Sequence, residues 1–541
     1  MRDFNLLEKI LKRHLKRKVT ITGSLIVIFL ITGGVPSLAR DLRTRNPEKN
    51  SIVFDSEKMK KNESINGTDV INIVNPDENG VSHNKFIDFS IGKDNGVIFN
   101  NSMENGASKI GGYLTKNPNL KNSATTILNE VTGNKVSNID GTVEIFGKRA
   151  DFILANENGI NVNGGNFINT TGVTLTTGSV KRDSSGLNFD TKRGNINLNG
   201  VSTSGEYFNV LAKTIEVYKE ISPLDGEKKP DISLIAGKNK IKLEDKNKKS
   251  PIITASENEK TEKYGIYAGA LGAMYGRNIR LVSTDKGLGV KHEGAIFSER
   301  DIVIDSKGDI SVGTLNSGDK INIKGKNLTT TNGSIKINGK DKEKLVSAKN
   351  NINLNLEENF NLKSLLQSTD GNINIEAKGV TLKEKTSARI LTKNSIALKV
   401  TDNLELEKVL IPTVPDTVSK DLIIDKDFKV KNIKSGKIYK DNEVKWIETG
   451  IFGKDIEIYA KTLKNRDIIS GENVSISSDG SISNDGIVSG DKNVLIKGKD
   501  IINSGIFQSK KDIQIENNDF LENDKKILGN SISIIAKNIN N

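Results

Sequence analysis

The most regular pattern in this sequence is a short alternation of apolar and polar residues that recurs along its second half. Runs of the form x-Ile-x-Ile are separated by Asn, Gly and Asp, which favour turns. The first apolar positions of five such runs recur at a nearly constant interval: Ile456, Val474, Val494, Ile513 and Ile532. Between the runs an Asn recurs at the same interval: Asn465, Asn484, Asn503 and Asn523. Two markers on one period indicate one supersecondary unit per repeat.

Strands with this alternation and Asn or Gly turns build a β-helical coil rather than a helical hairpin. We therefore predict a shaft of β-helical coils of about 20 residues each over residues 299–541. Stacked coils align Ile on Ile inside and can align Asn on Asn in a hydrogen-bonded ladder. One segment, about 407–446, breaks the rhythm with Pro412, Pro415 and the only Trp, and we expect it to be an excursion from the stack.

The first half of the chain shows similar strands at less regular spacing. Residues 70–74 and 85–91 predict the first strands, which we assign to a cap and the first rungs, because an uncapped solenoid exposes unpaired backbone. Residues 95–180 alternate apolar runs with Asn, Gly and Asn-Pro turns. The charged stretches 224–230 and 238–249 are expected to be loops that leave the stack.

Composition favours the same fold class. Hydrophobic residues make up 35% of the chain and aromatic residues 5%, which is low for a large globular core. A thin, stacked core needs β-branched residues more than aromatic ones. The sequence therefore predicts an all-β protein, a right-handed parallel β-helix (solenoid) with an N-terminal cap and side excursions.

Residues 1–39 have the pattern of an export signal. A basic region ends at Lys18, an apolar region follows over residues 19–32, and Gly and Pro then interrupt it. Small residues stand three and one positions before a predicted cleavage between Ala39 and Arg40. The apolar run is shorter than the ~20 residues that a bilayer-spanning helix needs, so a signal peptide is favoured over a retained anchor.

The sequence offers little catalytic or ligand-binding chemistry. It has no Cys, three His and no recognisable nucleophile motif, so we expect no metal, no cofactor and no enzymatic activity. A carboxylate pair on a β-helix face, as in polysaccharide-cleaving enzymes, is the enzymatic alternative. The net charge is +12, but no basic run with interleaved aromatic residues follows the start, so we expect no nucleic-acid partner.

Two Asn-rich motifs lie within residues 95–180. The first is Asn117-Pro118-Asn119-Leu120, and the second is Asn156-Glu157-Asn158-Gly159-Ile160. With their flanking runs, they resemble the N-terminal secretion domain of filamentous haemagglutinin-like exoproteins of two-partner secretion systems, which carries NPNL and NPNGI motifs in this order. The first motif is intact, whereas the second has Glu157 where the family usually has Pro.

The resemblance implies a domain plan and a function. Residues 1–39 would be the signal peptide, residues 40–298 the capped two-partner secretion (haemagglutination activity) domain and residues 299–541 the shaft. The implied partner is an outer-membrane β-barrel transporter with periplasmic domains, which exports the chain to the medium or to the surface of a Gram-negative cell. The implied function is attachment to a host-cell or bacterial surface receptor or glycan.

The resemblance also leaves alternatives open. One is that the chain is the stalk of a contact-dependent growth inhibition toxin, and another is that it is a haemolysin of the same secretion class. The two motifs either contact the transporter or hold the shape that it recognises. Family members are usually much longer, so we expect a truncated chain or one without a C-terminal functional domain.

Overall fold

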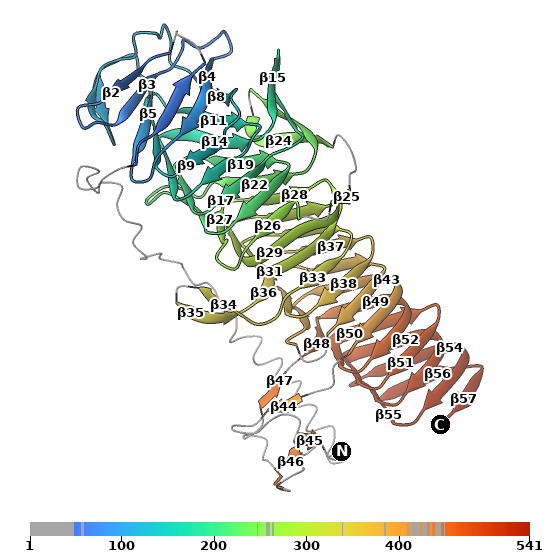
Figure 1. The fold of residues 1–541 in the computed structure, drawn as a ribbon. Coiled ribbons are helices and arrows are strands. Elements are labelled where there is room, and N and C mark those ends of the chain that lie inside the picture. Colours follow the sequence, from blue (N-terminus) through green and yellow to red (C-terminus); the bar gives the residue numbers. More distant parts are fainter. Residues whose placement is uncertain are drawn as a thin grey trace. The chain divides into compact units, whose positions relative to one another are not determined.

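A computed structural model describes residues 48–541 except 56–58, 246, 256–259, 262–263, 338, 384–385 and most of 408–448. The predicted signal peptide, with Ala39 and Arg40, lies outside the described residues. Within them, every regular element is a β-strand, which confirms the all-β prediction (Figure 1). No helix in this part of the chain could span a membrane.

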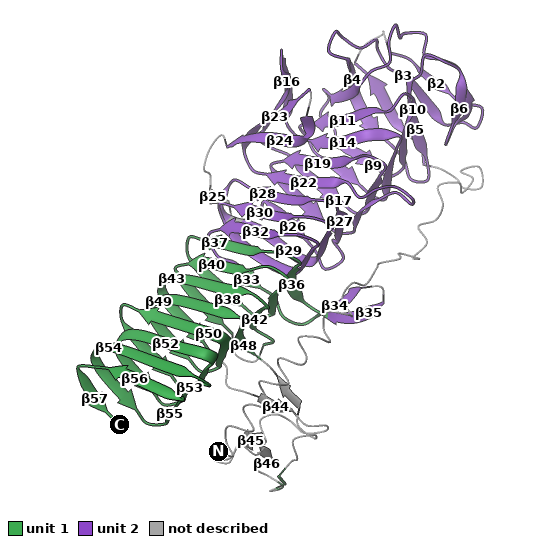
Figure 2. Cartoon of the chain, turned by 180° about the vertical axis from the view of Figure 1, so that it is seen from behind, with its two compact units in different colours: residues 1–33, 329–334, 343–541 green, residues 34–328, 335–342 purple. Residues whose placement is uncertain are grey.

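The chain divides into two compact units (Figure 2). Among the described residues, the N-terminal unit comprises 48–328 and 335–342, and the C-terminal unit comprises 329–334 and 343–541. The predicted boundary at 298 between secretion domain and shaft stays a prediction.

Parallel strands from successive coils build the N-terminal unit. Along one face the strands are, in stacking order, β8 (Thr126–Val131), β11 (Ala150–Asn156), β14 (Thr170–Thr176), β19 (Tyr207–Ala212), β22 (Asp231–Ala236), β28 (Ile279–Ser283) and β30 (Ile302–Ser306). Their register places buried apolar residues directly above one another, as in the run Phe152, Val173, Phe208 and Ile232. This is the parallel β-helix that the sequence predicts, because each coil buries its inward side chains only against its neighbours.

Antiparallel strands cover the start of the stack. Strand β1 (Ser51–Phe54) pairs antiparallel with β4 (Val81–Ser90), and β2 (Lys61–Glu63) pairs antiparallel with β3 (Asp69–Asn72). Strand β3 then pairs in parallel with β5 (Gly96–Asn101), so the cap passes directly into the first coils. The predicted strands at 70–74 and 85–91 correspond to β3 and to the second half of β4.

A row of phenylalanines fills the interior beneath the cap. Consecutive ring centroids lie 5.5, 5.0, 5.9, 5.3 and 5.5 Å apart along Phe54, Phe86, Phe89, Phe99, Phe152 and Phe167. All but the first are fully buried. Although the aromatic content of the whole chain is low, aromatic side chains are concentrated in this region. Tilted aromatic pairs of this kind add to the stability given by burial alone.

The four strands β15 (Ser179–Asp183), β16 (Gly186–Thr191), β23 (Asn239–Glu244) and β24 (Asn247–Ala255) form a separate antiparallel sheet. The prediction of a loop at 238–249 is therefore wrong, since these residues form β23 and the start of β24. The alternation of Lys with Ile241 and Leu243 buries both apolar side chains under the sheet. Residues 224–230, by contrast, form a turn and irregular backbone as predicted.

The C-terminal unit follows the predicted repeat. Its parallel strands include β43 (Ser395–Leu406), β49 (Asp455–Asn465), β50 (Ile468–Ser478), β52 (Ile487–Asn503), β54 (Asp512–Asn523) and β56 (Ser531–Ile535). The register pairs Ile456 with Val474, and then Val494, Ile513 and Ile532 in turn, which confirms the period. Strand β43 stacks directly on β49 although most of the residues between them, the predicted excursion, lie outside the described set.

Candidate functional site

The first motif forms the turn that leads from β7 (Gly112–Leu114) toward β8. The side chain of Asn117 is buried, and its Nδ2 donates hydrogen bonds to the carbonyl oxygens of Ile73 and Asn100, at 2.9 and 2.8 Å. Its Oδ1 accepts a hydrogen bond from the backbone N–H of Asn119 at 2.9 Å. One amide thus joins the chain after β3, strand β5 and its own turn, satisfying groups that would otherwise be buried unpaired.

The other three residues of the motif divide between inside and outside. Nδ2 of Asn119 donates to the carbonyl oxygens of Asn72 and Ile73, at 3.2 and 3.3 Å. Leu120 is buried, whereas Pro118 is exposed at the tip of the turn. The motif therefore fastens the loop to the end of β3 and leaves one rigid, apolar position facing outward.

The second motif connects β11 to β12 (Ile160–Val162) with the same device. Asn156 is buried, and its Nδ2 donates to the carbonyl oxygen of Lys135 and to Oγ of Ser137, at 2.9 and 3.0 Å. Its Oδ1 accepts from the backbone N–H of Asn158 at 3.0 Å, and Nδ2 of Asn158 donates to the carbonyl oxygen of Gly133 at 2.8 Å. In both motifs the first Asn closes the turn and the second Asn reaches the preceding coil.

The backbone after the second turn requires glycine. Gly159 has φ of 124°, a region that residues with a side chain rarely adopt. A Cβ there would lie 3.0 Å from the carbonyl oxygen of Asn195, which belongs to the next coil. Ile160 follows and is fully buried, so the motif ends by returning the chain to the stack.

The structure accounts for the departure at Glu157. This side chain is half-buried at the outward position that Pro118 occupies in the first motif, and its carboxylate lies 3.4 Å from the guanidinium of Arg193. The hydrogen bonds of the turn come from Asn156 and Asn158, so Glu in place of Pro leaves the turn intact. Within the described residues, the two motifs share no hydrogen bond, and each closes its own coil.

Sequence reasoning missed a second group of Asn residues that supports the first motif. Nδ2 of Asn100 donates to Oδ1 of Asn72 at 2.9 Å. Asn101 is fully buried; its Nδ2 donates to the carbonyl oxygens of Ala124 and Lys148, and its Oδ1 accepts the N–H of Ala124. The sequence feature that could have indicated this group is the pair of Asn residues at the end of an apolar run. From periodicity alone, such a pair is expected to form an exposed turn.

Two of the three histidines lie in the described part of the N-terminal unit. His83 lies 2.7 Å from Glu130, and this hydrogen bond lowers the pKa of the Glu130 carboxyl. His292 is buried inside the stack, where desolvation lowers its pKa to about 4. Among the described residues, no three His, Asp or Glu side chains are grouped to hold a metal ion.

Comparison with known proteins finds relatives of the region that holds both motifs. The TPS secretion domain family matches residues 49–312. Filamentous hemagglutinin of Bordetella pertussis is 40% identical over 251 residues, and the adenylyltransferase and cysteine protease IbpA of Histophilus somni is 32% identical over 450 residues. These alignments cover 46% and 80% of this chain, but only 7% and 10% of the relatives.

Two further relatives complete the comparison. The 16S rRNA endonuclease CdiA of Enterobacter cloacae is 34% identical over 282 residues, which is 50% of this chain and 8% of the relative. The solved filamentous hemagglutinin secretion domain is 30% identical, with a TM-score of 0.45, over 65% of this chain and 99% of that structure. The chain thus spans about a tenth or less of the length of the curated relatives named here.

Proposed function

Residues 49–312 of this chain are a TPS secretion domain, and we propose that they direct the chain through a partner β-barrel transporter in the outer membrane of a Gram-negative cell. Exoproteins of this family leave the cell for its surface or the medium. Periplasmic domains of the transporter would bind an extended segment of the chain by adding it to a sheet edge. Coils then fold outside one on another, so folding itself favours outward movement.

The burial of Asn117 and Asn156 supports a role for the motifs in holding shape. Both side chains are almost fully buried and are used up by intramolecular hydrogen bonds. Pro118 and Glu157 face outward and make none of the side-chain hydrogen bonds of the turns, so they are available for direct contact with a transporter, whereas the exposed Asn119 is held by its bonds to Asn72 and Ile73. The two roles therefore fall on different residues, which lets one experiment separate them.

We propose attachment to a host-cell or bacterial surface as the function of the exported protein. Sequence identity to filamentous hemagglutinin supports this proposal. The receptor would be a surface protein or glycan, and the chain described here would act without catalysis. The enzymatic names of IbpA and CdiA belong to those longer proteins, of which this chain covers 10% and 8%.

A secretion assay tests the export proposal. The full chain is expressed with and without its cognate transporter, and the variants Asn117→Ala, Asn119→Ala and Asn134→Ala are compared. We expect protein in the medium only with the transporter, and a reduced amount for Asn117→Ala and Asn119→Ala. Asn134 is exposed, so its variant is the matched control and should be secreted normally. Equal release without the transporter would contradict the proposal.

The variant Pro118→Ala distinguishes contact from support. If the motif only holds shape, Pro118→Ala secretes at nearly the control level, because its exposed ring makes none of the turn's side-chain hydrogen bonds. If the transporter reads the turn directly, secretion falls while the purified protein keeps its resistance to protease.

A second candidate function, the stalk of a contact-dependent growth inhibition toxin, is favoured by the similarity to CdiA. A co-culture assay tests it: cells that export the full-length product would inhibit neighbours that lack immunity. An adhesin instead clumps cells without loss of viability, and a haemolysin releases haemoglobin from red cells.

A further inference from the structure

The antiparallel sheet of the N-terminal unit is assembled from two hairpins that leave different coils. The first, β15 and β16, lies between the coil strands β14 and β17 (Asn195–Leu198), and the second, β23 and β24, follows β22. They meet through β16 and β23, with Phe189 opposite Ile241 and Leu187 opposite Leu243. Each hairpin therefore contributes half of one apolar face.

This face covers the outer surface of stacked coils. Leu187, Phe189, Ile241 and Leu243 pack against outward-pointing residues of successive strands. The covered residues are Val81, Leu128, Ile153, Ala155, Leu211, Ile235 and Val282. They come from β4, β8, β11, β19, β22 and β28, so one sheet covers residues of several coils and holds a second apolar core outside the coil interior.

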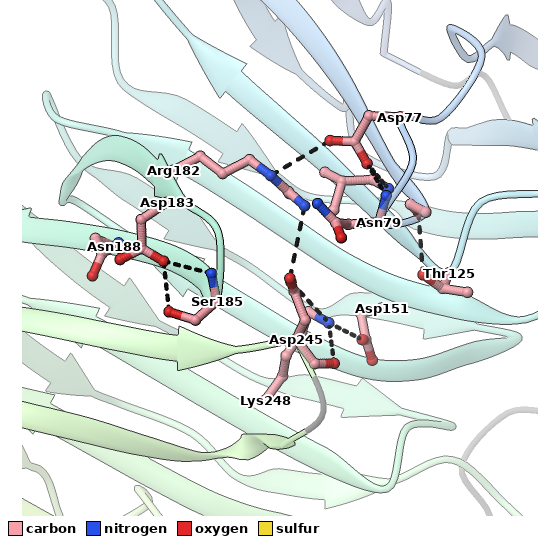
Figure 3. Close-up of polar contacts among 12 residues, drawn as sticks. Asp77, Asn79, Thr125, Asp151, Arg182, Asp183, Ser185, Asn188, Asp245 and Lys248 are labelled. Carbon is pink, nitrogen blue, oxygen red and sulfur yellow. Dashed lines mark hydrogen bonds and ion pairs between the residues drawn. The ribbon is translucent and has the colours of Figure 1, made fainter.

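Ion pairs join the sheet to the coils at the capped end. Nε of Arg182, on β15, lies 3.4 Å from Asp77 in the turn before β4, and its Nη2 lies 3.7 Å from Asp245 in the turn of the second hairpin (Figure 3). One guanidinium thus connects both hairpins with the start of the stack.

A buried lysine makes the second connection. Nζ of Lys248, on β24, donates to the carbonyl oxygen of Asp245 at 2.9 Å and lies 3.6 Å from the Asp151 carboxylate on β11 (Figure 3). Burial raises the pKa of Asp151, and the ammonium of Lys248 opposes that shift. Nδ2 of Asn209, on β19, donates to the carbonyl oxygen of Lys248 at 2.9 Å.

We propose that this sheet is a strap that closes over the coils only when the second hairpin arrives, and that Arg182 and Lys248 hold it shut. A two-stranded hairpin is marginally stable alone, whereas four strands with a covered apolar face are stable. The ion pairs join residues 77, 151, 182, 245 and 248, so they form only after the intervening coils have stacked.

The order of closing has a consequence that rests on the proposed export from N- to C-terminus. The outer apolar residues of β4 to β22 stay uncovered until about residue 255 has emerged. Closure then fastens coils that are not neighbours, which opposes unstacking of any single coil. The strap thus completes the N-terminal unit as one cooperative body.

Single cysteines test the strap directly, because the chain contains none. Ala155→Cys places a thiol under the sheet, and Ala212→Cys places one on β19 outside the group of residues that the sheet covers; both alanines are buried. The purified, exported full chain is labelled with a thiol reagent under native conditions. We expect position 155 to react faster than position 212, since opening the strap exposes only the former.

Arg182→Gln should then accelerate labelling at position 155 by about tenfold and leave position 212 unchanged, because it removes the cation beside Asp77 and one of the two cations beside Asp245, whose other is Lys248. Arg193→Gln is the matched control, since it removes an exposed ion pair of 3.4 Å that lies outside the sheet. If the Arg182 variant does not fold, Asp77→Asn replaces it, because an amide oxygen can still accept the turn hydrogen bonds from Asn79 and Val81.

Equal acceleration at both positions, or no acceleration at 155, would overturn the proposal. The assay uses folded protein after export. A failure of the strap is therefore distinguishable from a failure of transporter-dependent secretion, which is measured as protein in the medium.

Discussion

At the scale of a single residue, buried asparagine side chains supply the hydrogen bonds that the backbone of the β-helix turns lacks. Each turn between coils leaves N–H and C=O groups that no strand partner reaches. Asn117, Asn156 and Asn101 supply both a donor and an acceptor from buried positions. Removing one such side chain leaves its backbone partners without a hydrogen bond, which costs about 1–3 kcal/mol of stability.

His292 is a different kind of buried polar residue, and it predicts a pH dependence. Its position in the stack pairs it with Ala268 and Val312, and desolvation lowers its pKa to about 4. In the unfolded chain the imidazole of His292 becomes protonated near pH 6.5, whereas in the folded chain it stays neutral to a lower pH. The free energy of unfolding is therefore highest above pH 6.5 and falls as the pH drops toward 4. The loss amounts to about 3 kcal/mol.

His292→Leu should therefore flatten the stability profile between pH 6.5 and 4. The measurement is urea unfolding at several pH values, with the unsubstituted protein as the control. A His292→Leu profile as steep as that of the control would contradict the assignment.

At the scale of the element, the coils of the C-terminal unit are held in register by two kinds of column. Inside, buried apolar residues stack from Ile456 to Ile513, and the exposed Ile532 follows them in the same register. Beside them, each Asn donates from Nδ2 to Oδ1 of the next, at 2.8, 2.7 and 2.7 Å from Asn465 through Asn484 and Asn503 to Asn523. A slip by one residue would break both columns, so together they specify the coil boundary.

Asn484→Ala should destabilise the C-terminal unit by about 1–3 kcal/mol, since it removes both ladder bonds from a buried position. Asn493→Ala is the matched control, because Asn493 makes a similar 2.9 Å bond to Asn473 on the exposed side, and we expect a loss within about 0.5 kcal/mol. Hydrogen exchange of β51 (Ser481–Asn484) and β53 (Ile506–Ser509) measures the difference. Similar losses for both variants would show that burial does not decide the effect.

At the scale of the whole molecule, stacking makes folding directional if export runs from the N-terminus. A coil that fails early leaves no template for those that follow, whereas a late failure leaves the earlier coils folded. Two fully buried phenylalanines allow a matched comparison, Phe99 in the N-terminal unit and Phe507 in the C-terminal unit.

Phe99→Ala should abolish secretion of the full chain, and Phe507→Ala should permit it. Each substitution removes a similar burial, about 3–5 kcal/mol, so the difference isolates the position along the chain. Secreted Phe507→Ala protein should be cleaved by protease near β53 and resist cleavage in the N-terminal unit. Equal secretion of both variants would argue against coil-by-coil folding during export.

Sequence alone determined the features that repeat locally. The alternation of Ile and Val, the repeat period and the recurring Asn of the C-terminal unit were all legible, because each coil buries the same positions as its neighbour. The two Asn motifs were also recognisable, because a turn depends on a few consecutive residues. Their hydrogen-bond partners, such as Ile73 for Asn117, were not.

Only the tertiary structure decided features that join distant parts of the chain. The pairing of β16 with β23, the row of phenylalanines under the cap and the ion pairs of Arg182 and Lys248 link residues that no period relates. Residues 238–249 show the limit: their Ile and Leu alternate as in a strand, but charge suggested a loop. When a strand buries one face against a partner that is distant in the sequence, its own residues do not show what covers that face.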